Sequence, residues 1–300
     1  TSDAVTEDLA VMKKYEQTES VQESCLRLLS KLVWIVADFS DDEATEAIET
    51  VLVERSSFKE NCEIAKHTAI VFNYFAQTAG HRAKVQQSEI VPLLLSGIAI
   101  AEDEEAVVNA GEALGAILTI AELVTVFVES NGFPVTLQAF KKFATSQPAC
   151  VALFHMLSVV LSDKNVEHVE TMIMSEGIEN LTLPIQSHNE DKELVAASLD
   201  VAAKCCVSEM WSGTLSLMDL PLAVLNTLKK WQDEPLIVSP CLVILACAGQ
   251  EGDTVTLLVE NGIYEVTMNA LKTHKLNLDV CKGVLLVLHR LTSMDTMESG

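Results

Sequence analysis

Aromatic residues are scarce in this 300-residue chain, at 5% of the total, although hydrophobic residues reach 49%. The apolar residues are mostly Leu, Val, Ile and Ala, which favours packed helices over sheets. The sequence also lacks any apolar run of about 18 residues or more that would span a membrane, and nothing at its start resembles a signal peptide. Because the chain starts at Thr1 rather than Met, we expect a processed product or a fragment. A missing end would be the place for a targeting or lipid signal.

Basic residues are also few. The chain has 20 Lys and Arg residues against 43 Asp and Glu residues, which gives a net charge of −23. Such a surface repels nucleic acid and anionic lipid, because phosphate groups bind to basic surfaces. Basic proteins or peptides are the partners that this charge favours, although solubility alone would also account for it. The excess of acid is larger in residues 1–130 than in residues 131–300, at −14 against −9.

The sequence contains none of the motifs GxGxxG, GxxxxGKS/T, HExxH or GxSxG, which accompany common catalytic and nucleotide-binding sites. One local cluster has residue types that could ligate a metal, His168 with Glu167 and Glu170, but we interpret it as a solvated face of the connecting segment. The acidic run at residues 102–105 lacks the alternating ligands and the Gly turn of a calcium loop. We therefore expect no catalytic residues, no cofactor and no bound metal.

Eight cysteines are present, and none forms a CxxC pair. Each falls inside an apolar helical stretch, where a free Cys behaves as a small hydrophobic residue. Cys25, Cys150, Cys241 and Cys281 occupy similar points in a repeating pattern, as a residue at a close helix crossing would. We expect eight reduced thiols and a cytoplasmic protein. A redox role for the adjacent pair Cys205 and Cys206 is the alternative.

A repeated layout of about 43 residues runs through the chain. It is clearest in residues 131–175, which read as a short apolar helix, a polar turn, a longer apolar helix and a connecting helical segment. Matching boundary positions at 89, 132, 177, 220 and 262 are 43, 45, 43 and 42 residues apart. A helical period of this length predicts a solenoid. The predicted repeats are 1–42, 43–88, 89–131, 132–176, 177–219, 220–261 and 262–300.

Local signals place the helix ends within this pattern. Ser40 to Glu43 is predicted to cap the next helix, a short one at Ala47 to Leu52. Gly80 is predicted to end the next long helix in the left-handed conformation. Prolines at matching positions open the short helices (Pro134, Pro221) and the long helices (Pro148, Pro235). Pro184 and Pro240 fit less well, and a late start or a kink is expected at each.

The segments VQESCLRLLSKL, ACVALFHMLSVV and VCKGVLLVLHRL resemble the third helix of the armadillo repeat. SNGFP, SEGIE and ENGIY resemble the boundary between its repeats. The resemblance covers essentially all 300 residues and implies an all-α, armadillo-type α-solenoid, a right-handed superhelix of about seven repeats forming a single domain. The HEAT repeat, a similar helical repeat, is the alternative family. The Gly-led boundaries, and the lack of a first-helix Pro and Arg pattern, favour armadillo.

The resemblance implies a peptide- or protein-binding groove lined by the third helices. Family members that hold extended peptides carry a ladder of Asn, but here Asn73 alone sits at such a point, and Lys31 and Ala116 replace it in the neighbouring repeats. Trp34 is expected in the core, and Trp211 and Trp231 partly exposed. The candidate groove residues are Lys31, Asn73, Glu112, His155, Asp200 and His289.

Acidic residues in the first half of the chain form a second candidate site. One part of this site is a candidate acidic patch, and the other part is a group of glutamates in the preceding repeat: Glu43, Glu46, Glu49 and Glu54. The patch and the glutamates would attract a basic segment if they face the groove. Alternatively, these acids only solvate and stabilise helix starts. The patch consists of Glu102, Asp103, Glu104 and Glu105.

The function expected from these features is a non-catalytic scaffold that presents a groove to a protein or peptide partner. One alternative is an adaptor arm of a larger chain that recruits a motor, chaperone or signalling enzyme. Another is a regulatory domain with a small-molecule pocket between repeats, which would show as an apolar cavity with convergent polar groups.

Overall fold

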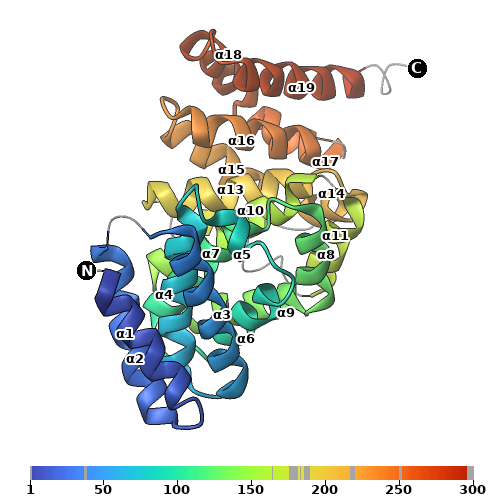
Figure 1. Ribbon diagram of the computed structural model, residues 1–300. Coiled ribbons are helices and arrows are strands. Elements are labelled where there is room, and N and C mark those ends of the chain that lie inside the picture. The colour runs from blue at the N-terminus through green and yellow to red at the C-terminus, as the bar shows by residue number, and fades with distance from the viewer. Residues whose placement is uncertain are drawn as a thin grey trace. The chain divides into compact units, whose positions relative to one another are not determined.

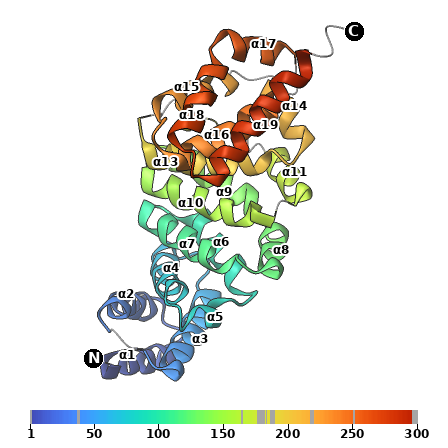
Figure 2. The same cartoon turned by 90° about the horizontal axis from the view of Figure 1, so that it is seen from above.

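The computed structural model describes residues 2–36, 39–163, 165–175, 182, 184–185, 190–216, 220–249 and 252–295 (Figures 1 and 2). Its internal contacts divide the chain into two compact units, Thr1–Val160 and Leu161–Gly300. We call them the N-terminal unit and the C-terminal unit and describe each by itself.

All regular structure among the described residues is helical: 18 α-helices and one 3-10 helix, with no strand in those ranges. The all-α prediction is confirmed. The helices of the N-terminal unit are α1 (Ser2–Lys14), α2 (Glu19–Ile35), α3 (Asp41–Ser57), α4 (Cys62–Gln77), α5 (Arg82–Val85), α6 (Ile90–Ile100), α7 (Glu104–Ile117), α8 (Ala121–Glu129), α9 (Gly132–Lys142) and α10 (Gln147–Val160). Those of the C-terminal unit are η1 (Leu161–Asp163), α11 (Val166–Met174), α13 (Lys192–Cys205), α14 (Glu209–Ser216), α15 (Leu220–Lys230), α16 (Pro235–Ala248), α17 (Gly252–Glu260), α18 (Ile263–Thr273) and α19 (Leu278–Asp295).

Seven long helices recur at the predicted period, and we call them the third helices: α2, α4, α7, α10, α13, α16 and α19. They begin at residues 19, 62, 104, 147, 192, 235 and 278, so successive starts are 42 to 45 residues apart. Within the N-terminal unit α4 lies between α2 and α7, and α7 packs on α10. Within the C-terminal unit α16 lies between α13 and α19 (Figure 1). This stacking of like helices confirms the solenoid.

Side-chain caps set where several third helices begin. Asn61, Asp103 and Asp191 each accept a hydrogen bond from the backbone N–H three residues later, at 2.8, 3.0 and 3.1 Å. Such a cap satisfies one of the N–H groups that the first turn leaves unpaired. Pro235 stands at the start of α16, as predicted. The local sequence therefore determines the starts of these helices.

The predicted cap at Ser40 is confirmed. Ser40 Oγ accepts from the Glu43 N–H at 3.2 Å, and Glu43 Oε2 accepts from the Ser40 N–H at 2.8 Å, which is a capping box. The predicted extent of this helix is wrong, because α3 runs over Asp41–Ser57 and not only over Ala47 to Leu52.

The prediction for Gly80 is wrong. Helix α4 ends at Gln77, and the next residue, Thr78, has an extended backbone conformation. No residue in the left-handed conformation is therefore needed to end this helix. The described residues with positive φ are Asn131 at 57° and Gly262 at 81°, both at predicted repeat boundaries. Helix α16 also runs through Pro240 without starting late. The boundary at Glu176 and Gly177, and most of the stretch around Pro184, lie outside the described residues.

Small residues let neighbouring third helices approach closely. A Cβ added to Gly111 on α7 would lie 3.3 Å from the Cβ of Ala152 on α10. One added to Gly283 on α19 would lie 2.8 Å from the Cβ of Leu242 on α16, too close for two real Cβ atoms. Cys25 and Cys150, two of the predicted packing cysteines, are buried. Burial raises the pKa of the Cys150 thiol to about 11, so this side chain acts as a packing group.

Two carboxylates lie in the core of the N-terminal unit. Glu54 on α3 is 2% exposed and Asp8 on α1 is also buried, and within the described structure Glu54 Oε2 and Asp8 Oδ2 have no hydrogen-bond partner. Burial, followed by the negative charge of Glu16, raises the pKa of Glu54 to about 7. Burial raises the pKa of Asp8 to about 6, against the lowering effect of a hydrogen bond with Cys25. Glu54 therefore does not belong to an exposed acidic field, contrary to the expectation from sequence.

We predict that Ser40→Ala lowers the free energy of unfolding by about 1 kcal/mol, because it removes the capping box of α3. Urea denaturation followed by circular dichroism measures the change. Thr18→Ala is the matched control, since Thr18 precedes α2 without a side-chain cap bond. Equal losses in the two variants would contradict the cap.

We also predict that the protein loses stability as pH rises from about 4.5 to about 7. The folded pKa of Glu54 is above its ordinary value of 4.5, so the folded state holds a proton that the unfolded state releases in this window. Glu54→Gln should match the wild type most closely at pH 4, where the Glu54 carboxyl is mostly protonated in both the folded and the unfolded state. At pH 8 it should be more stable by roughly 1 to 2 kcal/mol, since no buried charge has to form. Urea denaturation at the two pH values tests this, and parallel pH profiles would contradict it.

Candidate functional site

The exposed side of the third helices in the N-terminal unit is the surface on which the sequence places a partner, and we call it the third-helix face. On α7 it consists of Glu105, Asn109 and Glu112, which are four and three residues apart and so form one stripe along the helix. Glu105 and Glu112 are exposed and Asn109 is half-buried. Lys31 on α2 and His155 on α10 are also exposed.

Asn73 is not presented to solvent, contrary to expectation. Its side chain is 3% exposed, and its Nδ2 donates to Asn109 Oδ1 at 3.1 Å and to Glu112 Oε2 at 2.7 Å. Gln77 Nε2 donates to Asn73 Oδ1 at 3.3 Å. The amide of Asn73 is thus used to join α4 to α7. Among the six predicted groove residues, Asn73 and Glu112 are joined directly, by this hydrogen bond.

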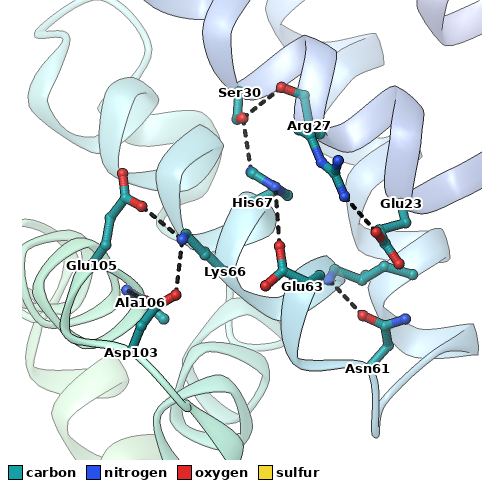
Figure 3. A network of polar contacts seen from close by, with 11 residues as sticks. Glu23, Arg27, Ser30, Asn61, Glu63, Lys66, His67, Asp103, Glu105 and Ala106 are labelled. Carbon is teal, nitrogen blue, oxygen red and sulfur yellow. Dashed lines mark hydrogen bonds and ion pairs between the residues drawn. The ribbon is translucent and has the colours of Figure 1, made fainter.

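A second buried bond joins α2 to α4 in the same way (Figure 3). Ser30 Oγ lies 3.0 Å from His67 Nδ1, and Glu63 Oε2 lies 3.7 Å from His67 Nε2. The order Ser, His, carboxylate is that of a nucleophile with its base, but Ser30 and His67 are both buried and Ser30 Oγ donates to the Arg27 carbonyl at 3.0 Å. Burial lowers the pKa of His67, so the ring is neutral at pH 7. This arrangement connects two helices.

The predicted acidic patch lies at the start of α7, and its members contact neighbouring repeats. Lys66 Nζ on α4 lies 2.8 Å from Asp103 Oδ2 and 2.8 Å from Glu105 Oε2 (Figure 3). Hydrogen bonds to these two carboxylates raise the pKa of Lys66. Ser146 Oγ, just before α10, donates to Glu104 Oε2 at 2.6 Å. Glu102 is exposed. The patch thus helps join α4, α7 and α10.

The remaining predicted residues, Asp200 and His289, lie in the C-terminal unit. Asp200 on α13 is half-buried, and its Oδ2 lies 3.1 Å from Lys204 Nζ on the same helix. His289 on α19 is exposed.

Two of the three tryptophans are placed differently from the prediction. Trp34, in the last turn of α2, is 59% exposed, and its ring meets Tyr74 of α4 edge to face with the centroids 5.3 Å apart. Trp211 on α14 is fully buried. Trp231 is half-buried, as expected, with Lys230 Nζ 5.4 Å from its ring centroid. The third-helix face therefore carries an exposed aromatic side chain that the sequence did not place there.

Sequence reasoning missed Asn109, Lys66 and the exposure of Trp34. Asn109 follows Asn73 by 36 residues, as His67 follows Ser30 by 37. A search at the repeat period of 42 or 43 cannot find such pairs. A search for polar residues about two helical turns less than a period apart would have found both.

Comparison with solved structures identifies the architecture. A designed armadillo repeat protein in complex with the peptide (KR)4 is 13% identical, with a TM-score of 0.61, covering 78% of this chain and 96% of that one. The fold is the armadillo repeat. A second designed armadillo repeat protein is 14% identical with a TM-score of 0.57, over 88% of this chain and 99% of its own. An engineered protein is 17% identical with a TM-score of 0.67, over 82% and 97%.

No protein-family model matches the sequence, and no curated protein matches it either. No helix in the part of the chain that the structure describes is long and apolar enough to cross a membrane. In the same residues there is no group of three or more His, Cys, Asp or Glu side chains placed to hold a metal ion.

We predict that Asn73 and Glu112 are energetically coupled. Their hydrogen bond is buried on the Asn side and has a carboxylate acceptor, so a double-mutant cycle of Asn73→Ala and Glu112→Ala should give a coupling of about 1 kcal/mol. The cycle cancels the cavity that each truncation leaves. A control cycle of Asn73→Ala with Glu122→Ala, on α8, should give a coupling near zero. Additive losses in the first cycle would show that this bond contributes nothing.

Proposed function

We propose that this protein is a non-catalytic interaction scaffold, and that the third-helix face of its N-terminal unit binds a basic peptide or a basic segment of a protein. The observation that carries the proposal is the acidic stripe on α7. Its exposed Glu105 and Glu112 stand on the outer side of a helix whose inner side packs between α4 and α10. Charge on the exposed side of such a helix is available to a partner.

The charge of the surrounding repeat supports a basic ligand. Residues 89–131 contain eight acidic residues and no Lys or Arg. Lys66 neutralises part of the charge at the start of α7. Glu112, about two turns further on, accepts a hydrogen bond from the neutral amide of Asn73 on the neighbouring helix, which does not neutralise its charge. A cationic side chain that lies across α7 therefore meets a carboxylate without an intervening base.

The aromatic pair of exposed Trp34 and half-buried Tyr74 adds a second element. Trp34 and Tyr74 lie at the C-terminal ends of α2 and α4, in the same unit as the α7 stripe. The face of an indole ring attracts guanidinium and ammonium groups. The designed armadillo repeat protein with the same fold is in complex with a peptide of alternating Lys and Arg, which supports a ligand of this class.

The test is binding of the fluorescent peptide (KR)4, measured by anisotropy at about 0.05 M and about 0.3 M salt. The double variant Glu105→Gln with Glu112→Gln should bind it several-fold to about tenfold more weakly at low salt, with a shallower salt dependence. Gln at 112 keeps an oxygen acceptor for Asn73, so the interface between α4 and α7 is preserved.

The matched control is Glu122→Gln with Glu129→Gln. It changes the net charge by the same amount, in the same repeat, at exposed positions on α8 rather than on a third helix. The control should bind the peptide as the wild type does. If both double variants weaken binding equally, net charge alone attracts the peptide and the third-helix face is not the site. If the wild type does not bind, the proposed ligand class is wrong.

A further inference from the structure

Two cysteines meet in the C-terminal unit where helix α13 packs on helix α16. Cys206 is the residue that caps the end of α13, and Cys247 lies in the last turn of α16. Both are free thiols, and their side chains are in hydrogen-bonding contact. Cys206 is half-buried and Cys247 is buried. We call Cys206 and Cys247 the thiol pair.

The closest contacts between other third helices show the register of this stack. A Cβ added to Gly111 on α7 would lie 3.3 Å from the Cβ of Ala152 on α10, and these residues are 41 positions apart. A Cβ added to Gly283 on α19 would lie 2.8 Å from the Cβ of Leu242 on α16, again 41 positions away. Residues 41 positions apart therefore oppose each other directly where the two helices are closest.

The thiol pair has this register. Cys206 and Cys247 are 41 positions apart, and α13 starts 43 residues before α16, as α7 does before α10. Cys206 comes 14 residues after the start of α13, and Gly111 comes 7 residues after the start of α7. Two helical turns separate these places, so both lie on the side that meets the next third helix. A disulfide needs two Cβ atoms about 3.5 to 4.5 Å apart, which this register provides.

The adjacent Cys205 is a poorer partner for either thiol. Neighbouring residues of a helix do not face each other, so Cys205 and Cys206 point in different directions. Cys205 also lies near Cys247, but it is fully buried and 42 positions away, one residue out of register. The adjacent pair that the sequence offers as a redox site is therefore not the pair that the fold brings face to face.

Trp211 on α14 places a hydrogen-bond donor beside the thiol pair. Its side chain is fully buried, and within the described structure its Nε1 has no hydrogen-bond partner. Contact with Cys247, followed by burial, raises the pKa of Cys206, and the indole of Trp211 acts in the opposite direction. A buried N–H group needs an acceptor, and a thiolate or an oxygen atom on the Cys206 sulfur would supply one. Cys206 is thus the thiol that is prepared to react first.

We propose that the thiol pair is an oxidation site, at which hydrogen peroxide produces a disulfide that joins α13 to α16. The Cys206 thiolate attacks one oxygen of the peroxide, the O–O bond breaks, and a sulfenic acid and hydroxide form. The Cys247 sulfur then attacks the Cys206 sulfur, the S–O bond breaks, and the oxygen leaves as water. Two thiols are oxidised, and one peroxide is reduced to two waters that take up the thiol protons.

The disulfide would connect two consecutive repeats of an array in which each repeat packs only on its neighbours. It would close a loop of 41 residues in the unfolded chain, which favours the folded state. This site goes beyond the proposed function, because it lies in the C-terminal unit and takes an oxidant rather than a peptide.

The test is treatment of the full chain with hydrogen peroxide, followed by alkylation of the remaining thiols and mass spectrometry without reduction. A protease that cuts after leucine separates Cys241 from Cys247 at Leu242 and Leu245. One disulfide should form, between the peptides that contain Cys206 and Cys247. Its rate should rise about tenfold for each pH unit between about 7 and 9, because the thiolate is the species that reacts. The same treatment in concentrated urea should give mixed pairings, which shows that the native fold selects the pair.

Three variants identify the sulfurs. Cys206→Ala and Cys247→Ala should abolish the cross-link, and the matched control Cys205→Ala should keep it. Oxidation should raise the urea midpoint of the wild type, dithiothreitol should reverse the change, and Cys206→Ala should show neither effect. Circular dichroism checks that each variant keeps its helical content, and the digest of the wild type decides if one does not fold.

Several results would overturn the proposal. They are a disulfide between Cys205 and Cys206, a cross-link that persists in Cys206→Ala, and oxidation of Cys206 to a sulfinic or sulfonic acid without any cross-link. A native chain that forms no disulfide at pH 9 would overturn it as well. Failure to bind (KR)4 would leave this result unaffected.

Discussion

The close approach of consecutive third helices is the contact on which the rest of this structure depends. Gly111 meets Ala152 between α7 and α10, and Gly283 meets Leu242 between α16 and α19. At such distances the backbones leave no room for larger side chains, so polar and bulky residues lie at the edges of the contact. A repeat packs only on its neighbours, so its stability depends on how well these few surfaces fit.

Polar bonds at the edges of these contacts keep the helices in register. In the N-terminal unit Ser30 with His67, and Asn73 with Asn109, join third helices at equivalent places. Bonds at the helix starts recur as well, with Ser146 meeting Glu104, and, in the C-terminal unit, Lys192 meeting Glu234 at 2.6 Å. Buried polar groups must find partners, and the neighbouring repeat supplies them. Several of the predicted site residues, Asn73, Asp103 and Glu104 among them, are thereby engaged in contacts between repeats.

The distribution of charge distinguishes two surfaces. The exposed part of α7 keeps carboxylates on its third-helix face, and α19 combines leucines with Lys282. In a chain with a large negative charge, the first surface adds to the overall field and the second opposes it.

The sequence by itself determined the repeat period, the helical class and many helix starts, because these depend on residues within one turn of each other or on a pattern that recurs. The capping box at Ser40 and the caps at Asn61 and Asp103 could be predicted or recognised locally. The tertiary structure decided which side chains are exposed to solvent. Asn73 is covered by α7, Trp34 is exposed beside Tyr74, and Trp211 is buried. The period gives the face of a helix on which a residue lies. It does not give the side chain that opposes that residue, which comes from another helix some 36 to 42 positions away and differs from repeat to repeat.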